Sequence, residues 1–527
     1  MEIINFVTNV LSQIQISDIF LALLGFFIVS CIHEKITNKL GPTLWPIVGM
    51  IPSFALHYQE IHEWNTKALE KSKGSYRVRG FLGGFPGIMI ADPIKIEYIL
   101  KTKFKNFPKG VFYRERFREL LGDGIFNSDD DKWKEQRRIA TSEMHTSRFV
   151  QYSLRTMQSL VHDKLLKVIE KQVNSSRDHT IDLQELLLRF TFDNVCVAAF
   201  GVDPGCLGLD LPDIPFAKAF EDATEYSLFR FLVPAFIWKT MRLFNVSKEK
   251  KLKNAVQIVH EFAETTVKNR KADLNKPGKL DRDPCDLLSR LIKMQENQLS
   301  KNSTQNFTDK FLKDFCISFI LAGRDTSSVA LVWFFWLVHE HPNVEAKILH
   351  EITAILSQRE TKDGLNDVVF QAEELDKMVY LQAALSESLR LYPSVPIDFK
   401  QAKEDDVFPD GMKIPKGHRV LYHVYAMGRL KSIWGEDSSE FKPERWFKDG
   451  EYASENQFRY VVFNAGPRLC VGKKFAYTQM KMVAASILLR YKVKVVKGQV
   501  ITPKVTTTLY MKHGLSVTFE PRQLVGK

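Results

Sequence analysis

The sequence predicts a mainly α-helical protein with minor β structure. Apolar residues recur at helical spacing in most windows from Tyr58 to about Leu391, and again from Lys474 to Arg490. An alternating, glycine-rich stretch at 76–91 and short extended runs at 500–521 predict the few strands. The chain has 527 residues, of which 45% are hydrophobic and 26% are charged, so a large core can form without disulfide bonds.

The first expected element is a membrane anchor. Residues 19–32 read IFLALLGFFIVSCI, an uncharged run of about 14 residues, whereas a spanning helix needs roughly 20. Both a cleaved secretory signal and a retained anchor fit such a run. Because no small-residue cleavage site follows it, and because Lys35 and Lys39 lie on its C-terminal side, the sequence favours a retained anchor with the body in the cytosol.

The chain is expected to divide into three regions. Residues 1–40 contain the anchor. Residues 41–52 read GPTLWPIVGMIP, and this mixture of proline and glycine favours a shaped, non-helical hinge. Residues 53–527 are expected to form the folded body.

The charge and the cysteines exclude several classes of protein. The net charge is +12, but the basic residues are dispersed and no helix-turn-helix, zinc-finger or RNA-binding signature is present. An anionic membrane or an acidic protein partner is therefore favoured over nucleic acid. The six cysteines are scattered without a C-x-x-C pair, which argues against a disulfide framework or a zinc ribbon.

A long apolar helix is predicted over residues 309–340. It is either a buried core helix or a second membrane span, and Arg324 and Asp325 in its middle argue against a span. Helical spacing continues on both sides of the stretch AGRDT at 322–326, which favours a kink within the helix. The polar region before it, 271–309, predicts surface loops around one helix.

Cys470 differs from the other cysteines in its surroundings. It lies in the loop FNAGPRLCVG, directly before the helix expected at 474–490. Arg468, Lys473 and the amino terminus of that helix would all lower the pKa of the thiol. The alternative for a lone cysteine is an inert buried side chain.

This loop resembles the haem-binding signature of the cytochrome P450 family. The resemblance implies the fold of that family for residues 53–527, haem b (iron protoporphyrin IX) as the cofactor, and the cysteine as the ligand of its iron. The pattern F-x-x-G-x-R-x-C-x-G is matched in full by Phe463, Gly466, Arg468, Cys470 and Gly472.

Further motifs follow the order found in that family. Trp133 and Arg137 resemble its W-x-x-x-R motif, whose side chains hold a haem propionate. Asp325 and Thr326 resemble its oxygen-activation motif, in which a hydroxyl and an acid deliver protons and carry out the catalytic role.

The resemblance also implies a structural cluster. Glu387 and Arg390 lie in ESLR, one helical turn apart, and Arg445 lies in the later segment FKPERW. In the family the corresponding side chains pair and lock the core behind the haem.

The activity implied is that of a monooxygenase that uses O2 and electrons from NADPH. Because no G-x-G-x-x-G fingerprint is present, the electrons are expected from another protein. The resemblance implies that this donor is NADPH–cytochrome P450 reductase, docked beside Lys473 and Lys474. The expected location is the endoplasmic reticulum membrane, with one membrane span and a cytosolic catalytic domain, and no nucleic-acid partner is expected.

The substrate is expected to be a long-chain fatty acid. EYILKTKFKNFPKG, LLGDGIFNSD and AGRDTSS resemble segments of the plant fatty-acid ω-hydroxylases linked to cutin and suberin, which oxidise the terminal methyl group. The aromatic segment 107–126 is a candidate channel wall, and Arg114, Arg116 or Arg118 could either meet the carboxylate or be solvated. The alternatives are a cytochrome P450 acting on another lipid (an alkane, an in-chain position or a terpenoid) and a haem-binding sensor without turnover.

Overall fold

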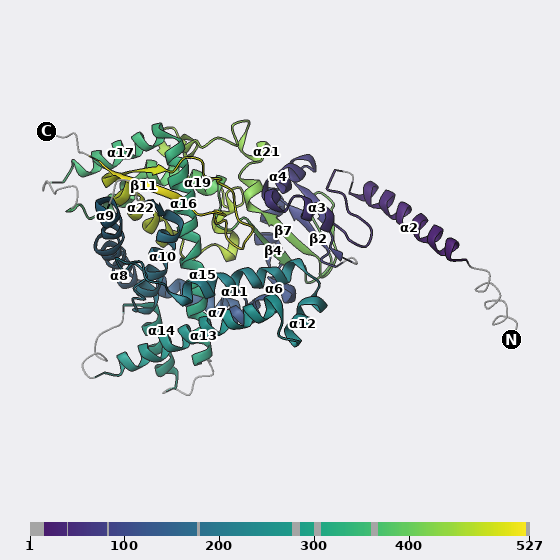
Figure 1. Ribbon diagram of the computed structural model, residues 1–527, viewed down its shortest axis with the longest axis horizontal. Helices are drawn as coiled ribbons and strands as arrows, with labels where there is room; N and C mark the ends of the chain where they lie inside the picture. The colour runs from purple at the N-terminus through teal and green to yellow at the C-terminus, as the bar shows by residue number, and fades with distance from the viewer. Residues whose placement is uncertain are drawn as a thin grey trace.

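The computed structural model describes residues 15–38, 40–81, 84–175, 180–276, 285–299, 307–359 and 367–522. Helices make up most of the body, and a small sheet lies on the side nearer the N-terminal helix (Figure 1). This confirms the predicted fold class, mainly α with minor β.

The helices of the N-terminal half are, in chain order, α2 (Ile16–Thr37), α3 (Ile51–Leu56), α4 (Ile61–Lys71), α5 (Pro93–Glu97), α6 (Gly110–Leu121), α7 (Asp130–Met144), α8 (Ser147–Ser159), α9 (Leu166–Ser175), α10 (Leu183–Phe200), α11 (Pro215–Leu232), α12 (Ala235–Leu243) and α13 (Ser247–Leu274). They are followed by α14 (Leu287–Leu299), α15 (Asp309–Gly323), α16 (Asp325–Glu340), α17 (Pro342–Leu356), α18 (Ala372–Lys377), α19 (Val379–Leu391), α20 (Val424–Met427), α21 (Lys431–Trp434) and α22 (Lys473–Arg490).

The strands form one larger sheet and three smaller ones within the described residues. The larger sheet has the order β1-β2-β7-β4, and only β2 and β7 run parallel. A second sheet joins β10, β11 and β3 near the C-terminal end of the chain. The bounds are β1 (Ser75–Val78), β2 (Gly87–Ile90), β3 (Ile181–Asp182), β4 (Ile397–Gln401), β5 (Asp406–Val407), β6 (Lys413–Ile414), β7 (Arg419–His423), β8 (Phe447–Lys448), β9 (Glu451–Tyr452), β10 (Tyr491–Val495) and β11 (Ser516–Pro521).

The predicted apolar helix at 309–340 is a core element, not a second membrane span. Its C-terminal half, α16, packs against α10, α19 and α22, and its side chains are buried on nearly every face. Trp333 is buried there, where its ring stacks on Tyr392 at 3.9 Å and its Nε1 donates to the Leu509 carbonyl at 2.7 Å.

This helix is interrupted at Arg324, within the stretch where the sequence predicts a kink. α15 ends at Gly323 and α16 begins at Asp325. The Arg324 carbonyl accepts a hydrogen bond from Thr191 of α10 at 2.7 Å, so part of the backbone bonding at the break is supplied by a neighbouring helix.

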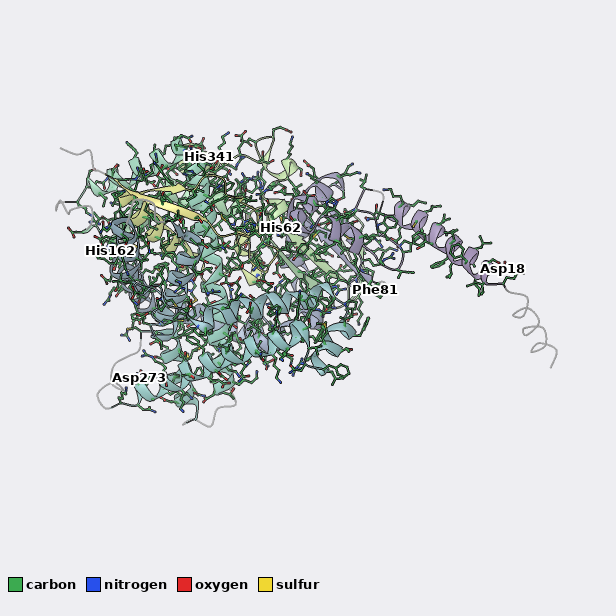
Figure 2. All side chains as sticks on the ribbon, viewed as in Figure 1. Asp18, His62, Phe81, His162, Asp273 and His341 are labelled. Atoms are coloured by element: carbon green, nitrogen blue, oxygen red, sulfur yellow. The ribbon has the colours of Figure 1, made fainter. Side chains whose placement is uncertain are left out.

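α2 extends away from the body (Figure 1), and its side chains project from the helix away from the rest of the chain (Figure 2). Residues 16–36 have a mean hydropathy of 2.1 and are not covered by the rest of the chain. An ion pair of 2.5 Å between Glu34 and Arg79 connects the end of the helix to the body. A helix this long and this exposed is typical of a membrane anchor.

Candidate active site

The loop that carries Cys470 is held by its own backbone. The Cys470 amide donates to the Phe463 carbonyl at 2.8 Å, and the Phe463 ring packs 5.2 Å from the ring of Tyr477. Gly466 has a φ of +60°, and a Cβ at this position would lie 2.2 Å from the carbonyl oxygen of Leu100. Glycine is therefore required at residue 466 by both backbone conformation and space.

Cys470 faces a cavity of about 440 Å³. Cys470 is exposed to this cavity, but the protein atoms packed around it raise the pKa of its thiol, while the Gly472 amide, Arg137 and Lys473 each lower it, and the raising effect prevails. Lys473 therefore acts as the sequence predicts, but Arg468 does not contribute, and these groups do not by themselves produce a thiolate. Coordination to a metal ion would supply the missing stabilisation of the negative sulfur.

Arg468 of the same loop reaches across to α7. Its Nη2 donates to the Asp129 carboxylate at 2.8 Å and to the Ser128 carbonyl at 3.0 Å. Its guanidinium lies over the ring of Trp133, 4.4 Å from the ring centre. The tryptophan and arginine predicted from two separate motifs therefore lie in contact.

Lys400 on β4 completes this group and was not predicted from the sequence. It is fully buried, and its pKa is lowered well below the usual value, by burial first and by Lys109 second. Asp398 opposes this shift, but its carboxylate is paired with Lys109 at 2.5 Å. Strand β4 was not predicted in the loop-rich sequence after Pro393. The sequence therefore gave no indication that the Lys400 side chain points inward.

These residues present several hydrogen-bond donors without acceptors. Within the described residues, the Nε of Arg468 and the Nζ of Lys400 are buried and have no hydrogen-bond partner. The Nε1 of Trp133 and the half-buried guanidinium of Arg137 also lack a hydrogen-bond partner there, but these atoms are not fully buried. Unsatisfied buried donors of this kind call for an anionic partner. A haem presents two carboxylates at one edge and an iron that a thiolate can bind, so this donor set fits it.

Thr326 and Asp325 lie at the break between α15 and α16, but their side chains have different partners. The Thr326 hydroxyl donates to the Ala322 carbonyl at 2.6 Å. The buried Asp325 carboxylate pairs with Arg324 at 2.7 Å through Oδ1, while its Oδ2 has no hydrogen-bond partner among the described residues. Burial raises the pKa of Asp325, and Arg324 opposes this rise.

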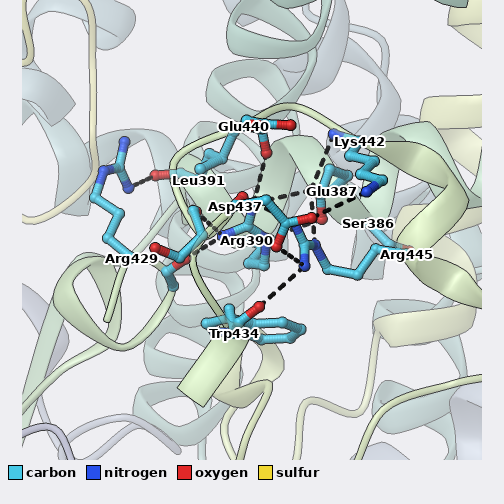
Figure 3. Close-up of polar contacts among 12 residues, drawn as sticks. Ser386, Glu387, Arg390, Leu391, Arg429, Trp434, Asp437, Glu440, Lys442 and Arg445 are labelled. Atoms are coloured by element: carbon cyan, nitrogen blue, oxygen red, sulfur yellow. Dashed lines mark hydrogen bonds and ion pairs between the residues drawn. The ribbon is translucent and has the colours of Figure 1, made fainter. Parts of the chain in front are cut away.

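Glu387, Arg390 and Arg445 come together in a buried cluster (Figure 3). Glu387 accepts two hydrogen bonds from Arg390, both 2.8 Å long, and one from Arg445 at 3.2 Å. Trp446 adds a fourth at 3.0 Å. Burial alone would lower the pKa of Arg445, but Asp437 and Glu387 outweigh it and raise this pKa.

The predicted channel segment divides into two parts. Phe112, Tyr113 and Phe117 of α6 form an aromatic cluster with Phe231 of α11 and Phe399 of β4, with ring centres 4.9 to 6.1 Å apart in the contacting pairs. The other two aromatic residues of the segment pack elsewhere: Phe107 against Tyr98, and Phe126 against the core around α10.

The three arginines proposed from the sequence for carboxylate binding have different environments. Arg114 and Arg118 are exposed, and Arg114 lies 3.6 Å from Asp129. Arg116 is buried, with 4% of its surface exposed. Only this one contacts the aromatic cluster, where its guanidinium lies 3.4 Å from the ring centre of Phe112.

Comparisons with known proteins agree with this geometry. A family model described as "Cytochrome P450" matches residues 40–520. "Cytochrome P450 86B1" of Arabidopsis thaliana is 48% identical over 520 residues, which cover 98% of this chain and 91% of that protein. "Cytochrome P450 94A2" of Vicia sativa is 39% identical over 496 residues, covering 92% of each chain, and "Cytochrome P450 704B1" of Arabidopsis thaliana is 36% identical over 517 residues, covering 92% of this chain and 95% of the relative.

Proposed function

The chain belongs to the cytochrome P450 family, and from this premise we propose that it hydroxylates long-chain fatty acids at the terminal carbon. The general activity, a haem-dependent monooxygenase, follows from the family. The observation that carries the finer proposal is the aromatic cluster on α6, α11 and β4 with a buried arginine against it. The resemblance of several segments to plant ω-hydroxylases supports the same substrate.

The cofactor we propose is haem b. Cys470 would bind its iron, the donors of Trp133, Arg137, Arg468 and Lys400 would hold its propionates, and Phe463 and Gly466 would shape the loop beneath it. When bound, the haem supplies the activation of O2 with electrons from a redox partner.

The protein's own contribution to catalysis is to deliver protons and to exclude water. The Thr326 hydroxyl lies at the helix break, where it would be free to give up its hydrogen bond to Ala322 and pass a proton toward the haem pocket. Asp325, a buried carboxyl group next to Thr326 with an unpartnered Oδ2, is proposed as the acid that supplies protons to this region. Its ion pair with Arg324 would have to loosen for this transfer, because the same carboxylate cannot serve both partners fully.

The electron donor we propose is NADPH–cytochrome P450 reductase. The cavity beside Cys470 is lined by Arg137, His145, Lys473, Lys474 and Lys481, with Asp376 as the one acidic residue of its lining. Such a basic surface favours an acidic redox protein.

The location we propose is the endoplasmic reticulum membrane, with the catalytic domain in the cytosol. α2 would be the single span of an anchor at 1–40, residues 41–52 the hinge and residues 53–527 the catalytic domain. Exposed apolar side chains on α3 and α12 support this location, because they would lie against the membrane surface. They are Ile51, Leu56, Phe236 and Leu243.

Product analysis tests the substrate. Microsomes that contain the full chain and the reductase would be incubated with NADPH and with lauric acid, palmitic acid, an alkane or a terpenoid. Mass spectrometry should then find the ω-hydroxy acid as the main product. Oxidation of the alkane or the terpenoid in place of the acids would reject the fatty-acid assignment, and NADPH consumption without any product would favour a role without turnover.

A further inference from the structure

Two arginines meet at the end of the four-stranded sheet where its inner strand β7 begins. Arg419 begins β7, and its guanidinium lies between two rings, 3.9 Å from the ring centre of Phe85 and 3.9 Å from that of Phe112. Arg116 of α6 lies against the same Phe112 ring at 3.4 Å. Two segments that are far apart in the sequence, α6 and β7, therefore bring two cations to one aromatic side chain.

The two arginines differ in how their donors are satisfied. Arg116 donates to the Arg230 carbonyl at 2.8 Å and to the Phe112 carbonyl at 3.0 Å, and Glu115 lies 3.7 Å away. Arg419 is 4% exposed and makes one long hydrogen bond, from Nε to the Pro86 carbonyl at 3.4 Å. Across the described ranges, neither Nη atom of Arg419 has an acceptor and no carboxylate pairs with it.

The charge of Arg419 is not balanced by a carboxylate among the described residues, whereas Arg116 has Glu115 at 3.7 Å. Burial, and then repulsion from Arg116, lower the pKa of Arg419 to about 9, and burial lowers the pKa of Arg116 to about 10 against the opposing effect of Glu115. Both side chains nevertheless remain protonated at neutral pH. A buried cation without a counter-ion is costly, so an anion that enters here gains more than it would at the surface.

The pair is distinct from the donors around Cys470. Lys400 and Arg419 lie on neighbouring strands of one sheet, but their side chains lie on opposite faces, because Arg419 is opposite Gln401, the residue after Lys400. Phe399 shares the face of Arg419 and packs against Phe112, Tyr113 and Phe231. The aromatic cluster therefore continues directly from the unpartnered arginine.

We propose that Arg419 binds the carboxylate of the fatty-acid substrate, with Arg116 adding to the positive field. This inference rests on the proposed function. The planar guanidinium offers two parallel N–H donors that match a carboxylate, and the aromatic cluster offers an apolar surface to the hydrocarbon chain that follows. A head group fixed at this end of the sheet leaves the methyl group as the part of the substrate that is free to extend toward the oxygen-activating site.

The wild-type enzyme gives the first test. Its KM for palmitic acid should be at least about ten-fold lower than for methyl palmitate, because the ester cannot form the charged pair. Equal KM values for the two compounds would overturn the proposal without any variant.

Variants give the second test. Arg419→Gln should raise the KM for palmitic acid at least about ten-fold with little change in kcat, and should leave the KM for methyl palmitate unchanged. Arg419→Lys should restore part of the difference, because it returns the charge but not the planar pair of donors. The matched control is Arg118→Gln on the exposed face of α6, for which both KM values should stay as in the wild type.

The outcomes separate this inference from the proposed function. A wild-type enzyme that oxidises neither compound rejects the fatty-acid assignment itself. A wild-type enzyme that hydroxylates palmitic acid normally, with an Arg419→Gln variant of unchanged KM, rejects only the carboxylate site. Equal losses for acid and ester in the variant would show that Arg419 maintains structure, and would also reject the site.

Discussion

Thr326 occupies the position where the central helix breaks. Its hydroxyl now donates to Ala322 and is half-buried, so it can turn to another acceptor without crossing the core. We expect Thr326→Ala to lower the yield of hydroxylated product per NADPH several-fold and to raise hydrogen peroxide by a matching amount, because proton delivery loses its nearest hydroxyl. Parallel assays of NADPH, product and peroxide measure this.

Ser328→Ala is the matched control for this experiment. Ser328 is buried on the same helix and donates to the Arg324 and Asp325 carbonyls at 3.0 Å each. The Ser328→Ala variant removes a hydroxyl group close to the helix break, but it leaves the half-buried hydroxyl of Thr326 in place. If both variants stayed as tightly coupled as the wild type, the catalytic role of Thr326 would have to be abandoned.

Residues in the site differ in how far the sequence predicts them. The proposed roles of Cys470 and Arg468 can be predicted from the sequence, because both residues belong to a short local pattern with glycines at fixed spacing. Lys400 could not be predicted, because its role depends on the register of β4 beside β7 and on a neighbour, Asp398, that is already engaged with Lys109. A single lysine in a strand that the sequence does not predict gives no indication of its register or of its neighbours.

At the scale of elements, α19 is connected to the chain around α21 by the Glu387 cluster. Arg390 donates to the carbonyls of Gly428, Ser438 and Glu440 as well as to Glu387, so one buried side chain joins several loops. We expect Glu387→Gln to destabilise the folded protein by about 3–5 kcal/mol, because it leaves buried Arg390 without its counter-ion. Urea denaturation, together with the yield of haem-containing protein, measures this.

A surface pair in the same region serves as the control. Lys347 and Glu444 form an ion pair of 2.6 Å, and both side chains are about half exposed. Lys347→Ala should cost at most about 1 kcal/mol. A Glu387→Gln variant no less stable than this control would contradict the proposed structural role.

α4 packs against α20 through a buried histidine that makes stability depend on pH. His62 is 6% exposed, neither ring nitrogen has a hydrogen-bond partner among the described residues, and its ring lies 5.6 Å from that of His423. Burial, and then Arg429, lower the pKa of His62 from 6.5 to about 4.

The sign of the effect follows from this lowered pKa. Between pH 6.5 and about 4 the unfolded chain binds a proton at residue 62 that the folded chain does not, so stability should fall as the pH falls through this window. The loss should be on the order of 3 kcal/mol for one such group. Urea midpoints at several pH values should show a shallower slope for His62→Phe than for the wild type, and an equal slope would contradict this role of His62.

At the scale of the whole molecule, the body is expected to fold without its anchor. α2 is exposed along most of its length, and the Glu34–Arg79 ion pair is one of its contacts with the body. Removal of residues 1–40 should therefore preserve the carbon-monoxide absorption band typical of a thiolate-bound haem and shift much of the protein into the soluble fraction. Loss of the band in the truncated chain would mean that the anchor supports the fold.

The full-length chain, fractionated in parallel, is the control. A truncated protein that stays wholly in the membrane fraction would indicate that apolar residues of α3 and α12 are a second attachment, since these side chains remain exposed after truncation.

The overall fold was predictable in its local parts and not in its long-range pairings. The break near Arg324 and the helix before Arg490 follow from spacing alone. The four-stranded sheet does not, because β2 and β7 pair although more than three hundred residues separate them. β10 was also missed, since YKVKV follows α22 without any turn signal.

The charged pair at the helix break has a consequence for biosynthesis. Residues 309–340 are long and apolar enough to be taken for a span when they leave the ribosome, before any partner helix covers them. Arg324 and Asp325 at the centre add about 2.5–3.5 kcal/mol each to the cost of transfer through the translocon into lipid. The same two side chains that shape the interior of the finished protein thus help to keep the newly made polypeptide from integrating a second time.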